Sequence, residues 1–203
     1  MNQKGFSILL GVLLLVFLAT GFSLGSDGFA VNNIVPELCG VFIELLIILW
    51  VFHKWREKSK QERLISLERR LREYLVFFLK HNFKSLPKEY QVGRFFGKDH
   101  SKNKEQLDKL LHHIRNMGLD ENVIISIQDH CGREARTLTS LLPVASELTN
   151  EHFKAWCRIV HFVNCIVDRK DSVSSSTIDI IQNIKRFDTA SYKYNLYVGA
   201  INA

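Results

Sequence analysis

The stretch from Ile34 to Phe52 reads IVPELCGVFIELLIILWVF, and the predicted fold depends on it. As an α-helix it is long enough to cross the roughly 30 Å hydrocarbon core of a bilayer. Glu44 lies near its middle. A carboxyl group at that depth is costly unless it is protonated, paired or turned toward protein or water. We therefore predict a transmembrane helix over residues 34–52, in which Glu44 serves packing or function.

A second apolar run precedes this stretch, over residues 6–24. It has two interpretations. Lys4 and the small residues Ala19, Thr20 and Gly21 are compatible with a cleaved signal peptide. The run is longer than a usual signal core, however, and another span follows at once, which favours a retained first transmembrane helix. Residues 1–53 are then a transmembrane hairpin.

The orientation of this hairpin is predicted from its flanking charges. The connector over residues 25–33 has no Lys or Arg, whereas basic residues crowd the far end of the second span. The positive-inside rule places such a connector in the periplasm and both termini in the cytoplasm of a bacterial inner membrane. The basic residues are Lys54, Arg56, Lys58, Lys60 and Arg63.

These five residues open a predicted basic juxtamembrane helix over residues 54–84. Attraction to anionic lipid headgroups explains their charge, and a polyanion such as nucleic acid is the other partner that they would suit. An apolar stripe runs along the helix at spacings of three and four residues, which indicates either a coiled coil or packing on the chain's own domain. Charged pairs at i,i+4, Glu68 with Arg72 and Arg69 with Glu73, are expected on its flanks. The stripe consists of Leu64, Leu67, Leu71, Tyr74 and Phe78.

Residues 85–203 are predicted to form a cytosolic helical domain, which makes the chain all-α. Ser85 to Ser101 reads as a loop because it contains Pro87, Gly93 and Gly97. Apolar periodicity and capping residues predict the helices that follow. The first two are expected over residues 104–117, with Gly118 as C-cap, and over residues 121–142, with Asp120 as N-cap and Pro143 ending or kinking the helix. The last two are expected over residues 151–168, capped by Thr149 or Asn150, and from Ser176 through Phe187. Tyr192, Tyr194 and Tyr197 are expected to pack back on the bundle.

The candidate functional face lies in the second span. Glu37, Gly40 and Glu44 share one side of a helix because steps of three and four residues return to the same side. A small, polar face of this kind suits close contact between helices, and Ser7 and Gly11 give the first span a matching small-x-x-x-small pair. Glu44 then either holds helices together in a hairpin or homo-oligomer, or lines an ion or water path.

Metal binding and catalysis find little support in the sequence. Cys157, His161 and Cys165 follow one helical face, but the first and last are about 12 Å apart along the axis, too far to share one ion. A core-facing stripe of thiols with one satisfied histidine is the preferred interpretation, and His130 and His152 are the histidines that could lie nearby. Motifs for phosphate loops, nucleophile elbows and zinc proteases are absent from the sequence. We therefore expect neither an enzyme nor a cofactor.

Gly40 to Lys58 (GVFIELLIILWVFHKWREK) resembles small bacterial membrane proteins in which two close spans carry a Glu before a Leu pair. The layout is similar to that of two-span effectors accompanying reverse transcriptases in retron anti-phage systems. The resemblance implies a protein silenced by a reverse transcriptase and its RNA–DNA product, then released on phage attack to damage the inner membrane. It maps Glu44 onto the family's intramembrane Glu.

Two functions therefore stand as the main hypotheses, and an enzyme on a membrane tether, which a deep polar pocket in the helical domain would suggest, is a third. The first is a membrane-disrupting effector of abortive infection, in which the helical domain senses a partner and the hairpin assembles in the bilayer. The second is a non-conducting anchor or scaffold that holds a cytosolic partner at the membrane.

Overall fold

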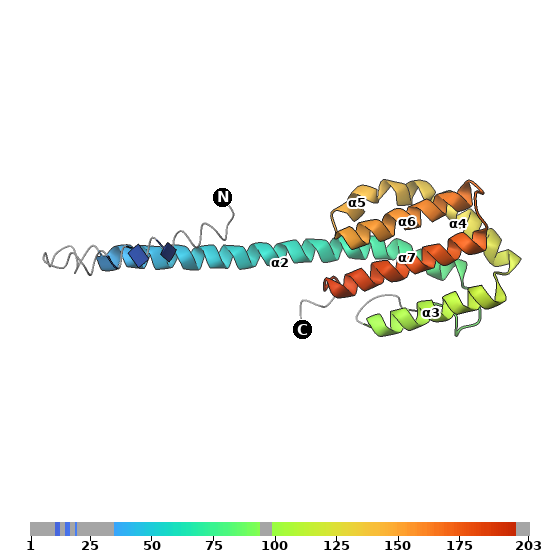
Figure 1. Cartoon of the computed structure of the whole chain (residues 1–203), viewed down its shortest axis with the longest axis horizontal. Helices are drawn as coiled ribbons and strands as arrows, with labels where there is room; N and C mark the ends of the chain where they lie inside the picture. The colour runs from blue at the N-terminus through green and yellow to red at the C-terminus, as the bar shows by residue number, and fades with distance from the viewer. Residues whose placement is uncertain (1–10, 13–14, 17–18, 20–34, 94–98, 198–203) are drawn as a thin grey trace. The chain divides into compact units, whose positions relative to one another are not determined.

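The computed structural model describes residues 11–12, 15–16, 19, 35–93 and 99–197, which contain helices and no strand (Figure 1). The predicted all-α class is confirmed over these residues. Ser7, the connector over residues 25–33 and most of the predicted first span lie outside them. The helices are α2 (Val35–Asn82), α3 (His100–Met117), α4 (Glu121–Ser140), the short α5 (Leu142–Ser146), α6 (Asn150–Val167) and α7 (Val173–Lys193).

The chain divides into two compact units, residues 1–60 and 61–203. Helix α2 contributes residues to both, and the predicted continuation of the second apolar stretch into the basic helix is confirmed, since α2 ends only at Asn82. Across the described ranges, no helix combines the length and the apolar character needed to cross a membrane. The transmembrane hairpin therefore stays a prediction.

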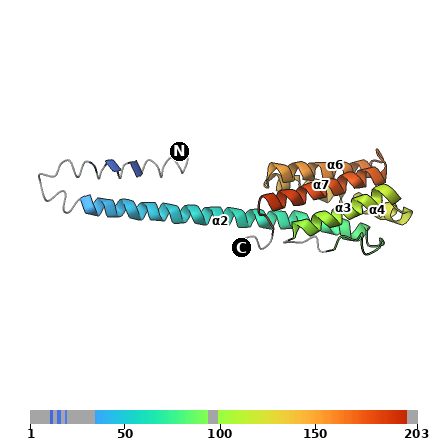
Figure 2. The same cartoon turned by 60° about the horizontal axis from the view of Figure 1, so that its bottom comes forward.

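The second unit is a helical bundle with one continuous apolar core. Its largest fully buried side chain is Trp156 of α6, whose indole Nε1 donates to the Leu138 carbonyl of α4 at 3.1 Å. Within the bundle, α7 lies between α6 and α3 (Figures 1 and 2). Helix α7 is thus the central element and is buried along much of its length. Further fully buried core residues are Leu71, Phe83, Leu107, Ile127, Ile180 and Phe187.

The apolar stripe of the basic helix packs on this core. Leu71 and Phe78 are buried, and Tyr74 lies against them at the edge of the cluster. The interpretation of the stripe as packing on the chain's own domain is therefore supported, at least for its C-terminal part. The expected i,i+4 pairs, Glu68 with Arg72 and Arg69 with Glu73, are both present, but Glu68 and Arg72 are buried.

Two helices begin earlier than predicted because an earlier residue caps them. Helix α3 starts at His100, where Asp99 Oδ1 accepts the Lys102 amide at 3.1 Å. Helix α7 starts at Val173, and its cap is Ser172, whose Oγ accepts the Ser175 amide at 3.2 Å. A short polar side chain before the first turn satisfies an otherwise unpaired backbone amide. Ser176, the predicted cap, is buried inside α7.

Other predicted helix ends agree with the structure. Thr149 caps α6, and Gly118 follows α3 with a positive φ of 77° while its amide donates to the Ile114 carbonyl at 3.0 Å. Asp120 occupies the N-cap position of α4 but makes no side-chain capping bond. Pro143 lies in the first turn of the short helix α5, where its missing amide costs nothing, and α4 ends before it at Ser140.

Candidate functional site

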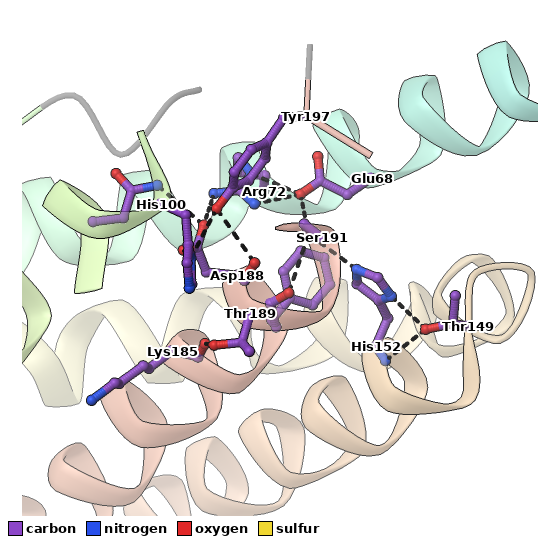
Figure 3. Close-up of polar contacts among 12 residues, drawn as sticks. Glu68, Arg72, His100, Thr149, His152, Lys185, Asp188, Thr189, Ser191 and Tyr197 are labelled. Carbon is purple, nitrogen blue, oxygen red and sulfur yellow. Dashed lines mark hydrogen bonds and ion pairs between the residues drawn. The ribbon is translucent and has the colours of Figure 1, made fainter. Parts of the chain in front are cut away.

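The charged side chains of Glu68, Arg72 and Asp188 form a cluster inside the bundle (Figure 3). Arg72 donates through Nε to Glu68 Oε1 at 2.7 Å, one turn earlier on α2. Its Nη1 donates to Asp188 Oδ1 on α7 at 2.6 Å. All three side chains are at most 3% exposed, which makes this a desolvated ion cluster rather than a surface pair.

Asp188 also connects the cluster to α3. Its Oδ1 also accepts from Asn103 Nδ2 at 3.2 Å, and its Oδ2 lies 2.8 Å from His100 Nδ1. Both partners belong to α3. Because a carboxylate can only accept, His100 donates through Nδ1. Tyr197, beyond the end of α7, covers the cluster with its ring 5.0 Å from the Arg72 guanidinium.

A chain of hydrogen bonds extends the cluster from α2 to α6. Ser191 Oγ lies 2.6 Å from Glu68 Oε1 and 3.0 Å from His152 Nε2, and His152 Nδ1 lies 2.7 Å from Thr149 Oγ1 (Figure 3). Glu68 can only accept, so the Ser191 hydroxyl donates to it and accepts from the Nε2–H of His152. Nδ1 then carries no proton and accepts from Thr149. The contacts thus assign one tautomer to the buried histidine.

The electrostatics of this network keep its groups in fixed charge states. Burial alone would lower the pKa of Arg72, but the neighbouring Glu68 and Asp188 carboxylates outweigh it and raise that pKa above its usual value. Burial, with the positive charge of Arg72, lowers the pKa of His152 to about 4. Burial also raises the pKa of the Tyr197 phenol. Arg72 is therefore charged and His152 neutral at pH 7.

The geometry suits positioning rather than chemistry on a substrate. His152 and Ser191 form a Ser–His pair, but both side chains are fully buried. A nucleophile needs access to its substrate and an adjacent base, and here the Ser191 proton is directed to Glu68 instead of to the histidine. The network joins α2, α3, α6, α7 and the segment that contains Tyr197.

One signal in the sequence points to this network. Helix α7 has a buried apolar face containing Ile180, Ile181, Ile184 and Phe187. Asp188 follows Ile184 by four residues and Ile181 by seven, so it falls on the same face. A carboxylate at a core position requires a buried cation. The missing information was which of the many Lys and Arg residues would meet it.

The predicted intramembrane face lies in the first unit. Glu37, Gly40 and Glu44 are all exposed on α2. A methyl group added at Gly40 would meet no described atom within 4 Å, and the same holds for Gly11. Among the described residues, nothing therefore covers the side at Gly40, and Ser7 lies outside them.

The predicted lipid or polyanion contacts are also exposed on α2. Lys54 lies over the ring of Trp50 at 5.9 Å from its centroid, and Arg63 forms an ion pair with Glu147 of the bundle. Arg63 is therefore committed in part to the bundle. The others, all exposed, are Arg56, Lys58 and Lys60.

The cysteine and histidine stripe of α6 is only partly core-facing. Cys165 is buried, with its Sγ 3.7 Å from His161 Nε2, whereas Cys157 is half-buried and His161 is exposed. The two histidines expected nearby lie elsewhere, because His130 packs among Phe77, Phe78 and His81 and His152 belongs to the ion cluster. Within the described part of the chain, no three His, Cys, Asp or Glu side chains are placed to hold a metal ion.

Comparison with known proteins adds no assignment. No protein-family model, curated protein or solved structure matches this chain.

Proposed function

We propose that this protein is a membrane-inserted effector that disrupts the bacterial inner membrane when its helical bundle is triggered. Residues 6–24 and 34–52 would form the transmembrane hairpin, with residues 25–33 in the periplasm and both termini in the cytoplasm. Several copies would assemble through the face of Glu37, Gly40 and Glu44. Activation would stop an infected host before phage multiplies.

The observation that carries the proposal is that α2 is apolar nearly all round between residues 41 and 52, with apolar side chains exposed on most of its sides. Consecutive residues of a helix are about 100° apart, so the exposed positions cover more than one stripe, and the half-buried Phe42, Leu46 and Leu49 make the remaining side apolar as well. A helix that is apolar all round is expected in a protein core or a bilayer. The exposed side chains are Val41, Ile43, Leu45, Ile47, Ile48, Trp50, Val51 and Phe52.

The ion cluster supports a sensing role for the bundle. Helix α2 contributes Glu68 and Arg72 to the cluster, and the same unbroken helix contains Glu44. A partner that altered the packing of α3 or α7 would act on the contacts that Asp188 makes with α2. The retron-type pathway rests on the resemblance of residues 40–58 alone. A reverse transcriptase encoded beside this chain would support it, and unrelated neighbouring reading frames would count against it.

Membrane insertion is tested with Ile47→Arg, compared with Ile125→Arg in the bundle. Both isoleucines are about half exposed, at 56% and 48%. An arginine near the centre of a span costs about 2.5–3.5 kcal/mol on insertion scales. The first variant should leave the membrane fraction, while the second stays with the wild type. A wild-type protein recovered wholly from the soluble fraction would contradict insertion.

Membrane disruption is tested with Glu44→Gln under induced expression, by uptake of an impermeant dye. Wild type that admits dye, and a variant that reaches the membrane without admitting it, would support a path lined by Glu44. A variant that no longer oligomerises would assign Glu44 to helix packing instead. Replacing both spans by an unrelated hairpin distinguishes the anchor hypothesis from the effector hypothesis, because an anchor would keep its activity and an effector would lose it.

A further inference from the structure

A basic groove lies over α7 between α3 and α6. Its volume is 580 Å³, and it is lined by five basic and two acidic side chains, which leaves a net charge of +3. All of its lining residues belong to the bundle unit, so the groove exists whether or not the apolar segment crosses a membrane. The basic side chains are Arg115, Lys154, Arg158, Lys185 and Arg186.

Regular helices build this groove. Lys154 and Arg158 are four residues apart on α6, and Gln182, Lys185 and Thr189 follow one another at steps of three and four residues on α7. Residues three or four apart project from one side of a helix. The charges therefore come from packed helices and not from loops, as expected of a largely preformed site.

Only part of the positive charge in the groove is neutralised. Asp108 pairs with Lys185, and Glu151 pairs with Lys193, which is not part of the lining, at 2.6 Å. In the described portion of the structure, none of the other four cations has a carboxylate partner, and Arg186 donates to the Asn183 side-chain oxygen at 3.0 Å. The three besides Arg186 are Arg115, Lys154 and Arg158. Like charges held close together on rigid helices favour an anion that can join them.

The lining also limits which anion would fit. Among the described lining residues, Leu111 and Ala155 are the apolar ones, and none carries an aromatic ring on which a base could stack. Arginine guanidinium groups match phosphate oxygens in bidentate geometry. The volume lies within the range of roughly 300–1,000 Å³ typical of small-molecule sites.

We propose that the basic groove binds a small soluble ligand with two or more adjacent phosphate groups, such as a polyphosphate chain or a nucleoside triphosphate. Recognition would come from the phosphates, with Arg115 and Arg158 on opposite walls. Because the described lining residues offer no ring for stacking, inorganic tripolyphosphate should bind about as well as ATP. This binding goes beyond the proposed membrane activity and does not depend on it.

The test is isothermal titration of the full chain, purified in a mild detergent, with tripolyphosphate. The variant R115Q/R158Q should bind about 100-fold more weakly, since each lost charge-assisted hydrogen bond contributes about 1.5 kcal/mol or more. The control K104Q/R136Q removes the same charge from exposed positions of α3 and α4 outside the lining. It should bind within about twofold of wild type.

Several outcomes would overturn the proposal. They are no tripolyphosphate binding by wild type, equal weakening in both double variants, and binding of a single-stranded oligonucleotide while tripolyphosphate fails to compete. Tight binding of ATP without tripolyphosphate would also overturn it, since a base would then be recognised. Lys154→Gln, a single change at an exposed position, provides a milder variant with an intermediate loss expected. Helicity measured by circular dichroism checks that each variant is folded.

Discussion

Arg72 Nη1 lies 2.6 Å from Asp188 Oδ1, although 116 positions separate the two residues in the sequence. The same guanidinium contacts Glu68 on its own helix at 2.6 Å. The C-terminal part of α2 is thereby joined to α7 through a contact that excludes water. Buried charges of this kind are tolerated only while every partner is in place.

Arg72→Met should lower the free energy of unfolding by about 3–5 kcal/mol, because it leaves two carboxylates buried without a cation. Arg69→Met is the matched control, since Arg69 pairs with Glu73 at the same i,i+4 spacing but both are more than half exposed. That surface pair is expected to contribute about 0–1 kcal/mol. Urea unfolding followed by circular dichroism measures both. Similar losses in the two variants would show that the cluster is not desolvated in solution.

Ser191→Ala should destabilise the bundle by about 1–3 kcal/mol, because Glu68 loses a donor and the His152 Nε2–H loses its acceptor. Thr189→Ala is the control. Its hydroxyl donates to the Lys185 carbonyl one turn earlier at 2.9 Å, and Ser191 Oγ lies at a similar 3.1 Å from the Phe187 carbonyl, but Thr189 is exposed and, among the described residues, makes no hydrogen bond to the cluster. The control should stay within about 0.5 kcal/mol of wild type. Thermal unfolding at pH 7 distinguishes them.

Stability should fall as the pH is lowered from about 6.5 to about 4. Burial lowers the pKa of both His130 and His152 to about 4, whereas an unfolded chain takes up those protons near pH 6.5. In that window the unfolded state binds more protons, so the free energy of unfolding decreases with falling pH. Each histidine contributes at most about 1.4 kcal/mol per pH unit.

The variant His130→Phe isolates one of these contributions. Its ring would keep the aromatic surroundings of Phe77 and Phe78, at 5.3 and 5.4 Å between centroids. Between pH 6.5 and 4, the free energy of unfolding should change less steeply with pH than in the wild type, by the contribution of one histidine. From pH 7 to 9 it should depend on pH as in the wild type. An unchanged slope at low pH would mean that His130 is protonated in the folded protein.

Two glycines should respond in opposite directions to alanine. Gly118 has φ 77° and ψ −171°, a region that residues with a side chain avoid, so Gly118→Ala should cost about 1–3 kcal/mol. Gly132 is an exposed residue inside α4, and a methyl group there would meet no described atom within 4 Å. Gly132→Ala should therefore stabilise by about 0.5–1 kcal/mol. Thermal melts of the two variants give the comparison, and a gain at Gly118 would contradict it.

Most helices were predictable because their signals are local. Apolar periodicity located α3, α4, α6 and α7, and Thr149 and Gly118 marked boundaries through bonds to their own neighbours. The starts of α3 and α7 were missed by a few residues because Asp99 and Ser172 compete with later polar residues for the capping position. Tyr197 is buried on the bundle as expected. Tyr192 and Tyr194 are exposed, but their rings still contact the bundle, Tyr192 at 4.7 Å from His100 and Tyr194 at 6.4 Å from His152 between ring centroids.

The sequence by itself determined the all-helical content and the uneven distribution of charge, and it revealed a carboxyl group inside an apolar stretch. These features depend on residues a few positions apart. Only the tertiary structure decided that Glu68 and Arg72 turn inward, because an i,i+4 pair has the same spacing whether water or Asp188 lies beside it. The basic groove depends in the same way on the register of three helices, since its unpaired cations become neighbours only when α3 and α6 pack on α7.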